Sequence, residues 1–162
     1  MAQLIKNGVA ARDSWQILEL AEGESPETVA LPDGEVIFPL AVWLARKDEI
    51  LSRPTIGLLL QPADRVEDIA GELASFALIA VNFPKFVDGR GYSTAALLRQ
   101  RYGYTGELRA VGDVLHDQLF FMRRVGFDSY ALKDGKNLPY AIEAAFKPFG
   151  DAYQGATDQA QP

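Results

Sequence analysis

The sequence predicts an α/β domain built from repeated βα units, with a mainly parallel sheet and an N-terminal β-hairpin. Two continuously apolar runs, 55–61 and 77–82, alternate with segments whose apolar residues recur at helical spacing. That alternation is typical of parallel strands covered on both faces. Asn7-Gly8, a favoured hairpin turn, lies between two short apolar stretches. The sheet is expected to be either an open doubly wound sheet or a partial (β/α) barrel, and both alternatives stay open.

Residues 1–38 are expected to form a hairpin and a connection. The hairpin is predicted over 3–20, with Trp15 and Ile17 on the side that follows the turn. Segment 22–35 is acidic and rich in turn residues, which is typical of a surface connection, and one short strand is predicted within it at 29–31.

Residues 39–150 are expected to form the core of βα repeats. Pro39 suits a first helical turn, so a helix is predicted from there to about Ser52. Asp64 and Ser93 are expected to cap later helices. Strands are predicted at 55–61, 77–82, 108–112 and 127–132, and further helices at 65–76, 93–102, 114–125 and 138–146. Residues 1–150 would thus make one domain, followed by a flexible tail at 151–162.

Composition excludes several classes of chemistry. The net charge of −6 argues against general binding to nucleic acid or to anionic membranes. The chain has no cysteine, so it carries no disulfide, thiolate metal site or Cys-ligated cluster, and a single histidine, His116, cannot form a histidine metal cluster. No metal site is predicted. No signal peptide or membrane span is recognised, so a cytoplasmic protein is expected.

A candidate site follows from the loops at the predicted strand ends, because ligands of α/β proteins bind beyond the carboxyl ends of strands. Glycines let the backbone approach a ligand closely, and Arg90 could hold a carboxylate, phosphate or sulfur oxyanion. The predicted anion-binding or ligand-binding residues are Asp88, Gly89, Arg90, Gly91, Tyr92, Ser93, Arg109, Asp113, Asp117 and Gln118. The alternative is that Asp88–Arg90 and Arg109–Asp113 are ion pairs that hold loops in place. Phe83 and Phe86 could dock a partner.

The same loop does not match a nucleotide fingerprint, because its Gly-x-Gly lacks both a third glycine at the proper offset and a Walker lysine. No cofactor is predicted, although a flavin or NADP stays open as an alternative. No catalytic residue is assigned.

Three motifs resemble the DUF934 family of uncharacterised bacterial proteins: Phe83-Pro-x-Phe-x-Asp-Gly-Arg-Gly-Tyr-Ser93, Gly106-Glu-Leu-Arg-Ala-Val-Gly-Asp-Val114 and Gly126-Phe-Asp128. The resemblance implies an accessory role in assimilatory sulfate or sulfite reduction, with sulfite reductase or phosphoadenylyl-sulfate reductase as partners. Family members are described as oxidoreductases. Sulfite reduction needs electrons that this chain cannot supply without a cofactor or a partner, so independent catalysis is not expected.

Three functional hypotheses result. The first is an accessory protein that binds a small oxyanion or a partner reductase through loops 83–93 and 109–118. The second is a cofactor-dependent oxidoreductase subunit that binds a flavin or a nicotinamide phosphate at the same strand ends. The third is a purely structural subunit. The sequence does not set the oligomeric state.

Overall fold

The structure is a computed structural model that describes residues 3–84, 89–114 and 118–131. Its centre is one eight-stranded sheet with the order β2-β1-β8-β7-β6-β5-β4-β3. Six of these strands run parallel, each beside the next in sequence: β3 (Gln16–Ile17), β4 (Val36–Pro39), β5 (Gly57–Leu60), β6 (Leu78–Phe83), β7 (Glu107–Gly112) and β8 (Ser129–Tyr130).

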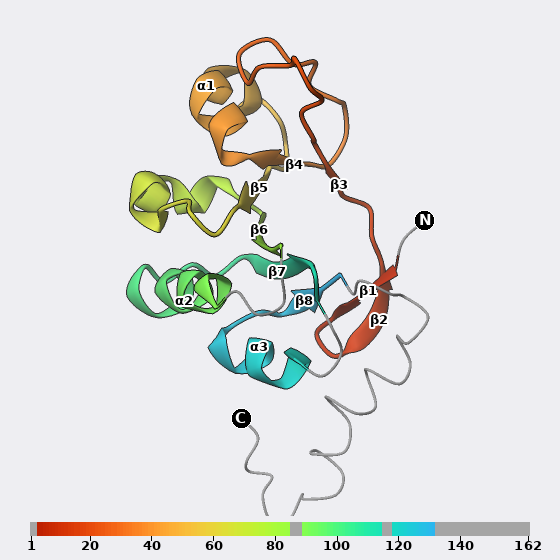
Figure 1. The fold of residues 1–162 in the computed structure, drawn as a ribbon, viewed down its shortest axis with the longest axis vertical. Coiled ribbons are helices and arrows are strands. Elements are labelled where there is room, and N and C mark those ends of the chain that lie inside the picture. The colour runs from red at the N-terminus through yellow and green to blue at the C-terminus, as the bar shows by residue number, and fades with distance from the viewer. Residues whose placement is uncertain (1–2, 85–88, 115–117, 132–162) are drawn as a thin grey trace, which may run out of the picture.

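The helices lie together on one face of this sheet, which curls into a half-barrel (Figure 1). They are α1 (Leu40–Ile50), η1 (Val66–Ser75), α2 (Arg90–Ala96) with its continuation η2 (Leu97–Arg101), and α3 (Leu119–Val125). Parallel crossovers share one hand, so a strand order that never reverses places every connecting helix on the same side. The α/β class and the partial-barrel alternative are therefore confirmed. The doubly wound alternative requires a reversal of strand order that the described strands lack.

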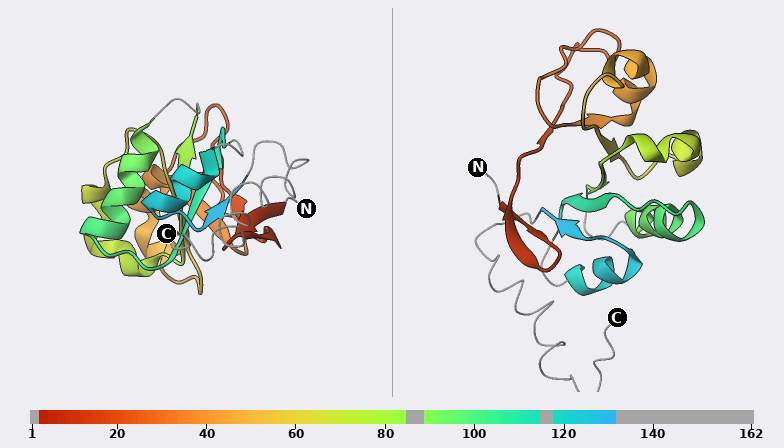
Figure 2. Two further views of the ribbon diagram at one scale, coloured as in Figure 1. Left: turned by 90° about the horizontal axis from the view of Figure 1, so that it is seen from below. Right: turned by 180° about the vertical axis from the view of Figure 1, so that it is seen from behind.

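The predicted hairpin is present but shorter than expected. β1 (Gln3–Lys6) pairs antiparallel with β2 (Val9–Arg12), and Asn7 and Gly8 have φ values of 54° and 83°, as the tight hairpin turn requires. β1 also pairs antiparallel with β8, so the hairpin extends the sheet at one edge. The prediction that residues up to Leu20 belong to the hairpin was wrong, because β3 pairs parallel with β4 at the opposite edge. Figure 2 shows the hairpin on the side away from the helices.

Several predicted boundaries were also wrong. The strand expected at 29–31 is absent, and β4, which was not predicted, ends at Pro39 immediately before α1. The segment after Asp64 is a 3₁₀ helix, and the Asp64 carboxylate accepts a hydrogen bond from the Gln61 backbone at 2.8 Å instead of capping it. Ser93 lies inside α2, whose first residue is Arg90. The helix predicted at 138–146 and the tail lie outside the described residues.

The two faces of the sheet bury different clusters. The larger core lies between the sheet and the helices and includes Trp43, Ile69, Leu98 and Met122 from the helical layer. The inner face of the half-barrel holds a smaller apolar cluster formed by Ile37, Leu59, Leu78, Ala80 and Val111. The described part of the chain contains no helix long and apolar enough to cross a membrane.

Candidate functional site

The carboxyl ends of β6 and β7 form the edge at which most of the predicted site residues gather. The two strands are parallel neighbours in which Phe83 pairs with Gly112. The Asp113 backbone N–H donates to the Phe83 carbonyl at 2.7 Å, which ties the loop after β7 to the end of β6. Gln118 immediately precedes α3, which follows the same loop. The structure therefore brings Gly89–Ser93, Asp113 and Gln118 to one edge, here called the carboxyl edge.

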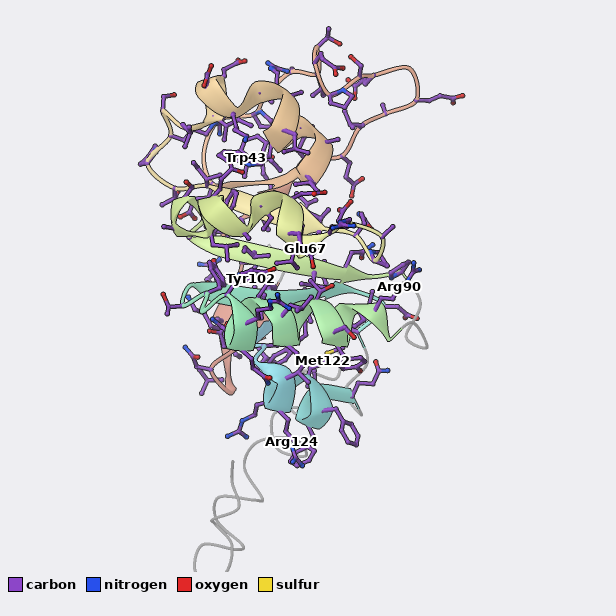
Figure 3. All side chains as sticks on the ribbon, turned by 90° about the vertical axis from the view of Figure 1, so that its left-hand side faces the viewer. Trp43, Glu67, Arg90, Tyr102, Met122 and Arg124 are labelled. Atoms are coloured by element: carbon purple, nitrogen blue, oxygen red, sulfur yellow. The ribbon has the colours of Figure 1, made fainter. Side chains whose placement is uncertain are left out.

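Tight packing against the end of β6 fixes the start of α2. A Cβ atom on Gly91 would lie 2.5 Å from carbons of the Phe83 ring, so only glycine fits there without a shift of that ring. The Tyr92 ring contacts the same phenyl ring edge-on, with 5.3 Å between the centroids. Arg90 is exposed at the first helical position, and Figure 3 shows it at the opposite end of this helical run from Tyr102. A cation is thus presented at the carboxyl edge.

Of the remaining predicted residues other than Arg109, the structure describes only Phe83. Phe83 is only 1% exposed and packs against Tyr92 and Phe127, so its predicted role in docking a partner was wrong. Phe86, Asp88, His116 and Asp117 lie outside the described residues.

Arg109 does not lie at the carboxyl edge. It pairs with Ala80 and Ser129 in the middle of the sheet, three residues before Gly112, or roughly 10 Å along the strand. Its side chain projects onto the inner face and is buried, with the residue 3% exposed. The guanidinium donates to Asp13 Oδ1 at 2.8 Å, to Glu107 Oε2 at 2.9 Å and to Ser129 Oγ at 3.2 Å. The sequence left open whether Arg109 binds a ligand or forms a structural ion pair. Its geometry is that of a structural ion pair, although its partners are not the predicted Asp113.

The ion pairs around Arg109 form a closed charge network on the inner face. Lys6 on β1 approaches the second carboxylate oxygen of Glu107 at 3.1 Å, so two cations face the two carboxylates of Asp13 and Glu107. Burial alone would raise the pKa of Glu107, but hydrogen bonds from Ser129, Arg109 and Lys6 together hold that pKa below its usual value. The network joins three parts of the chain: the hairpin, the segment that precedes β3, and β7 itself.

Arg99 is the centre of a second hydrogen-bond network, at the opposite edge of the sheet, where the parallel strands begin. It donates to the carbonyls of Gly126, Tyr104 and Gly106 at 2.8–2.9 Å and to Asp128 at 3.3 Å. Most of the hydrogen bonds that Arg99 donates go to backbone carbonyls, so the role of this arginine is to stabilise the loops.

A cavity of about 530 Å³ opens at the carboxyl end of the inner face, beside the carboxyl edge. Its polar lining includes Gln61, which follows β5, and Asn82 on β6, and the Asn82 amide donates to Gln61 Oε1 at 2.8 Å. Neither residue was predicted from the sequence as a site residue. A polar side chain near the end of an otherwise apolar strand, as Asn82 is, was the available signal.

The described residues contain no group of three His, Cys, Asp or Glu side chains arranged to hold a metal ion. Among the described residues, the polar groups at the carboxyl edge include Arg90, the amide of Gln118, the hydroxyls of Tyr92 and Ser93, and the carboxylate of Asp113. This set suits hydrogen bonding and charge pairing with a small ligand.

Comparison with known proteins identifies the family. Residues 57–162 match the DUF934 model, described as a bacterial protein of unknown function. Because the match covers more than half of the chain, the chain belongs to the DUF934 family. None of the curated proteins and none of the solved structures compared with the chain matches it.

Proposed function

We propose that this protein is an accessory protein of assimilatory sulfite reduction that binds a small sulfur oxyanion at the carboxyl edge and works in contact with the reductase. The pathway comes from the family resemblance. The observation that supports a binding site at this edge is that Asp113, directly after β7, is hydrogen-bonded to the end of β6, with Arg90 exposed at the start of α2. In half-barrel and full-barrel folds this is the end at which ligands bind.

Arg90 is the residue proposed to hold the anion. A guanidinium offers two parallel N–H groups that match two oxygens of sulfite or sulfate. The packing of Gly91 on Phe83 holds the helix start close to β6, so the arginine is presented from a fixed backbone. Arg109 is not part of this proposal, because its donors are directed to Asp13, Glu107 and Ser129.

Isothermal titration calorimetry tests the anion site. Sulfite, sulfate and phosphate are titrated into the wild-type protein, into Arg90→Ala and into Arg101→Ala. Arg101 is a matched control because it is also exposed and lies at the far end of the same helical run. Binding to the wild type and to Arg101→Ala, with at least about a tenfold loss in Arg90→Ala, is expected for one lost charge-assisted contact. If none of the anions binds the wild type, or if Arg101→Ala loses as much as Arg90→Ala, the site is not at Arg90.

A further inference from the structure

We propose that the cavity at the carboxyl end of the inner face binds a neutral small molecule that presents a carboxamide or a cyclic amide to the side chains of Gln61 and Asn82. This site is distinct from the proposed anion site at Arg90, because it lies on the inner face of the half-barrel and not at the start of α2. It is called here the amide cavity.

The amide cavity is placed where four parallel strands end. Pro39 ends β4, Leu59 and Gln61 lie at the end of β5, and Asn82 and Val111 lie near the ends of β6 and β7. Residues Ile17 to Leu20, at and after β3, complete its wall. A volume of about 530 Å³ accommodates a small organic molecule, within the range usual for ligand pockets.

The paired amides define what the cavity can recognise. Each primary amide carries one acceptor oxygen and one donor NH₂ group. In the observed pair, Asn82 Nδ2 donates to Gln61 Oε1, which leaves Gln61 Nε2 as a donor and Asn82 Oδ1 as an acceptor. Turning both amides over reverses the two roles but still leaves one donor and one acceptor. The pair therefore complements a group that has an N–H beside a C=O.

Gly112 leaves room for the Asn82 amide. A Cβ atom at Gly112 would lie 2.4 Å from Asn82 Oδ1 and 2.6 Å from the Phe83 carbonyl oxygen. The φ of +94° at Gly112 is also a conformation that other residues rarely adopt. Glycine thus allows the Asn82 amide to lie close to β7, where it lines the cavity.

The remaining lining selects against anions. Apolar side chains, among them Ile17, Leu59 and Val111, supply the walls, and the only charged residue that lines the cavity in the described chain is Glu19. A carboxylate ligand would face both the Glu19 side chain and the Asn82 acceptor, and it would have no N–H to offer that acceptor. A neutral molecule with an amide group and an otherwise apolar structure is not repelled by Glu19, and its N–H can donate to the Asn82 acceptor.

The test is a titration followed by ¹H–¹⁵N NMR, which resolves the side-chain NH₂ signals of Gln61 and Asn82. The probes are nicotinamide, which carries a primary carboxamide, 2-pyridone, which is a cyclic amide of similar size, and nicotinate, which replaces the carboxamide of nicotinamide with a carboxylate. At least one amide probe is expected to shift the Gln61 and Asn82 signals with a dissociation constant on the order of millimolar, as suits a fragment of this size. Whichever amide binds more tightly identifies the class of amide. Nicotinate is expected to bind at least about tenfold more weakly.

Substitutions locate the binding. Asn82→Leu keeps the approximate size of the side chain and removes both amide groups, and Gln61→Met does the same at an exposed position where folding is less sensitive. Each is expected to weaken amide binding at least about tenfold, while Arg90→Ala leaves it unchanged and loses the oxyanion instead. The proposal is overturned if neither amide probe binds, if nicotinate binds as tightly as the tighter of the two amide probes, or if the folded Gln61→Met variant keeps wild-type affinity.

Discussion

The guanidinium of Arg109 on β7 donates a hydrogen bond to Asp13 Oδ1 at 2.8 Å, joining two positions that are 96 residues apart in the chain. Asp13 Oδ1 also accepts from the Trp15 backbone N–H at 3.0 Å. The pair therefore fixes the segment between β2 and β3 against the inner face of the half-barrel. Trp15, two residues after Asp13, packs against the apolar cluster of the same face, so the ion pair and this packing hold the segment together.

Replacing Arg109 is expected to reduce stability strongly. Arg109→Ala removes one partner of buried ion pairs and leaves Asp13 and Glu107 without their shared cation, which typically costs about 3–5 kcal/mol. Urea denaturation followed by circular dichroism measures the free energy of unfolding. Arg12→Ala is the control, because Arg12 is exposed on β2, and it is expected to change stability by no more than about 0.5 kcal/mol. Equal losses in the two variants would show that the network around Arg109 contributes little.

Glu107 is expected to make the protein sensitive to acid. The pKa of Glu107 lies below the ordinary value of 4.5 in the folded state, because the hydrogen bonds from Ser129, Arg109 and Lys6 outweigh the effect of burial. The unfolded chain therefore takes up this proton first, so the contribution of Glu107 is present above about pH 4.5 and is lost as the pH falls towards the folded pKa.

The comparison of wild type with Glu107→Gln isolates this residue. The stability difference between the two proteins, measured by urea denaturation, is expected to be largest at about pH 7 and to shrink by about pH 3. Burial raises the pKa of Asp128, so that carboxylate acts in the opposite direction, but it is present in both proteins, so only the smaller part of its shift that comes from the charge of Glu107 differs between them. A difference that stays constant over this range would contradict the pairing of Glu107.

Gly112 is expected to tolerate no side chain. Gly112→Ala combines a strained φ of +94° with contacts of 2.4 and 2.6 Å to Asn82 Oδ1 and the Phe83 carbonyl oxygen, and we expect a loss of about 2 kcal/mol or more. Gly71→Ala is the matched control, since its Cβ meets nothing within 4 Å in η1, and the stability is expected to stay equal or to rise slightly. A thermal-denaturation midpoint in Gly112→Ala as high as in Gly71→Ala would contradict the geometry.

The parallel core could be predicted from the sequence because its signals are local. The apolar runs at 55–61 and 77–82 contain β5 and most of β6, and Asn7-Gly8 does turn the hairpin. β4 was not predicted because it is only four residues long and ends at Pro39. A proline at this position also favours the start of a helix, so Pro39 was assigned to the helix. The half-barrel could not be separated from a doubly wound sheet, since strand order depends on contacts between elements and not on periodicity.

The site shows the same division between local and distant information. The convergence of Gly89–Ser93 with Asp113 follows from two parallel strands being neighbours, and it was expected. The partners of Arg109 were not expected, because Asp13 belongs to a segment that crosses the inner face. No local pattern in the residues of that segment predicts this path. Side-chain spacing around Arg109 and Asp113 suggested a pair, but Asp113 lies beyond the end of β7, whereas alternation within β7 places Arg109 and Glu107 side by side on the inner face.

The proposed role is tested most directly by association with sulfite reductase. The purified protein is mixed with the sulfite reductase hemoprotein at micromolar concentrations, and complex formation is followed by analytical size-exclusion chromatography. We expect a complex to form with the wild type and with Arg101→Ala. Absence of any complex at these concentrations would contradict the role as an accessory protein that works in contact with the reductase.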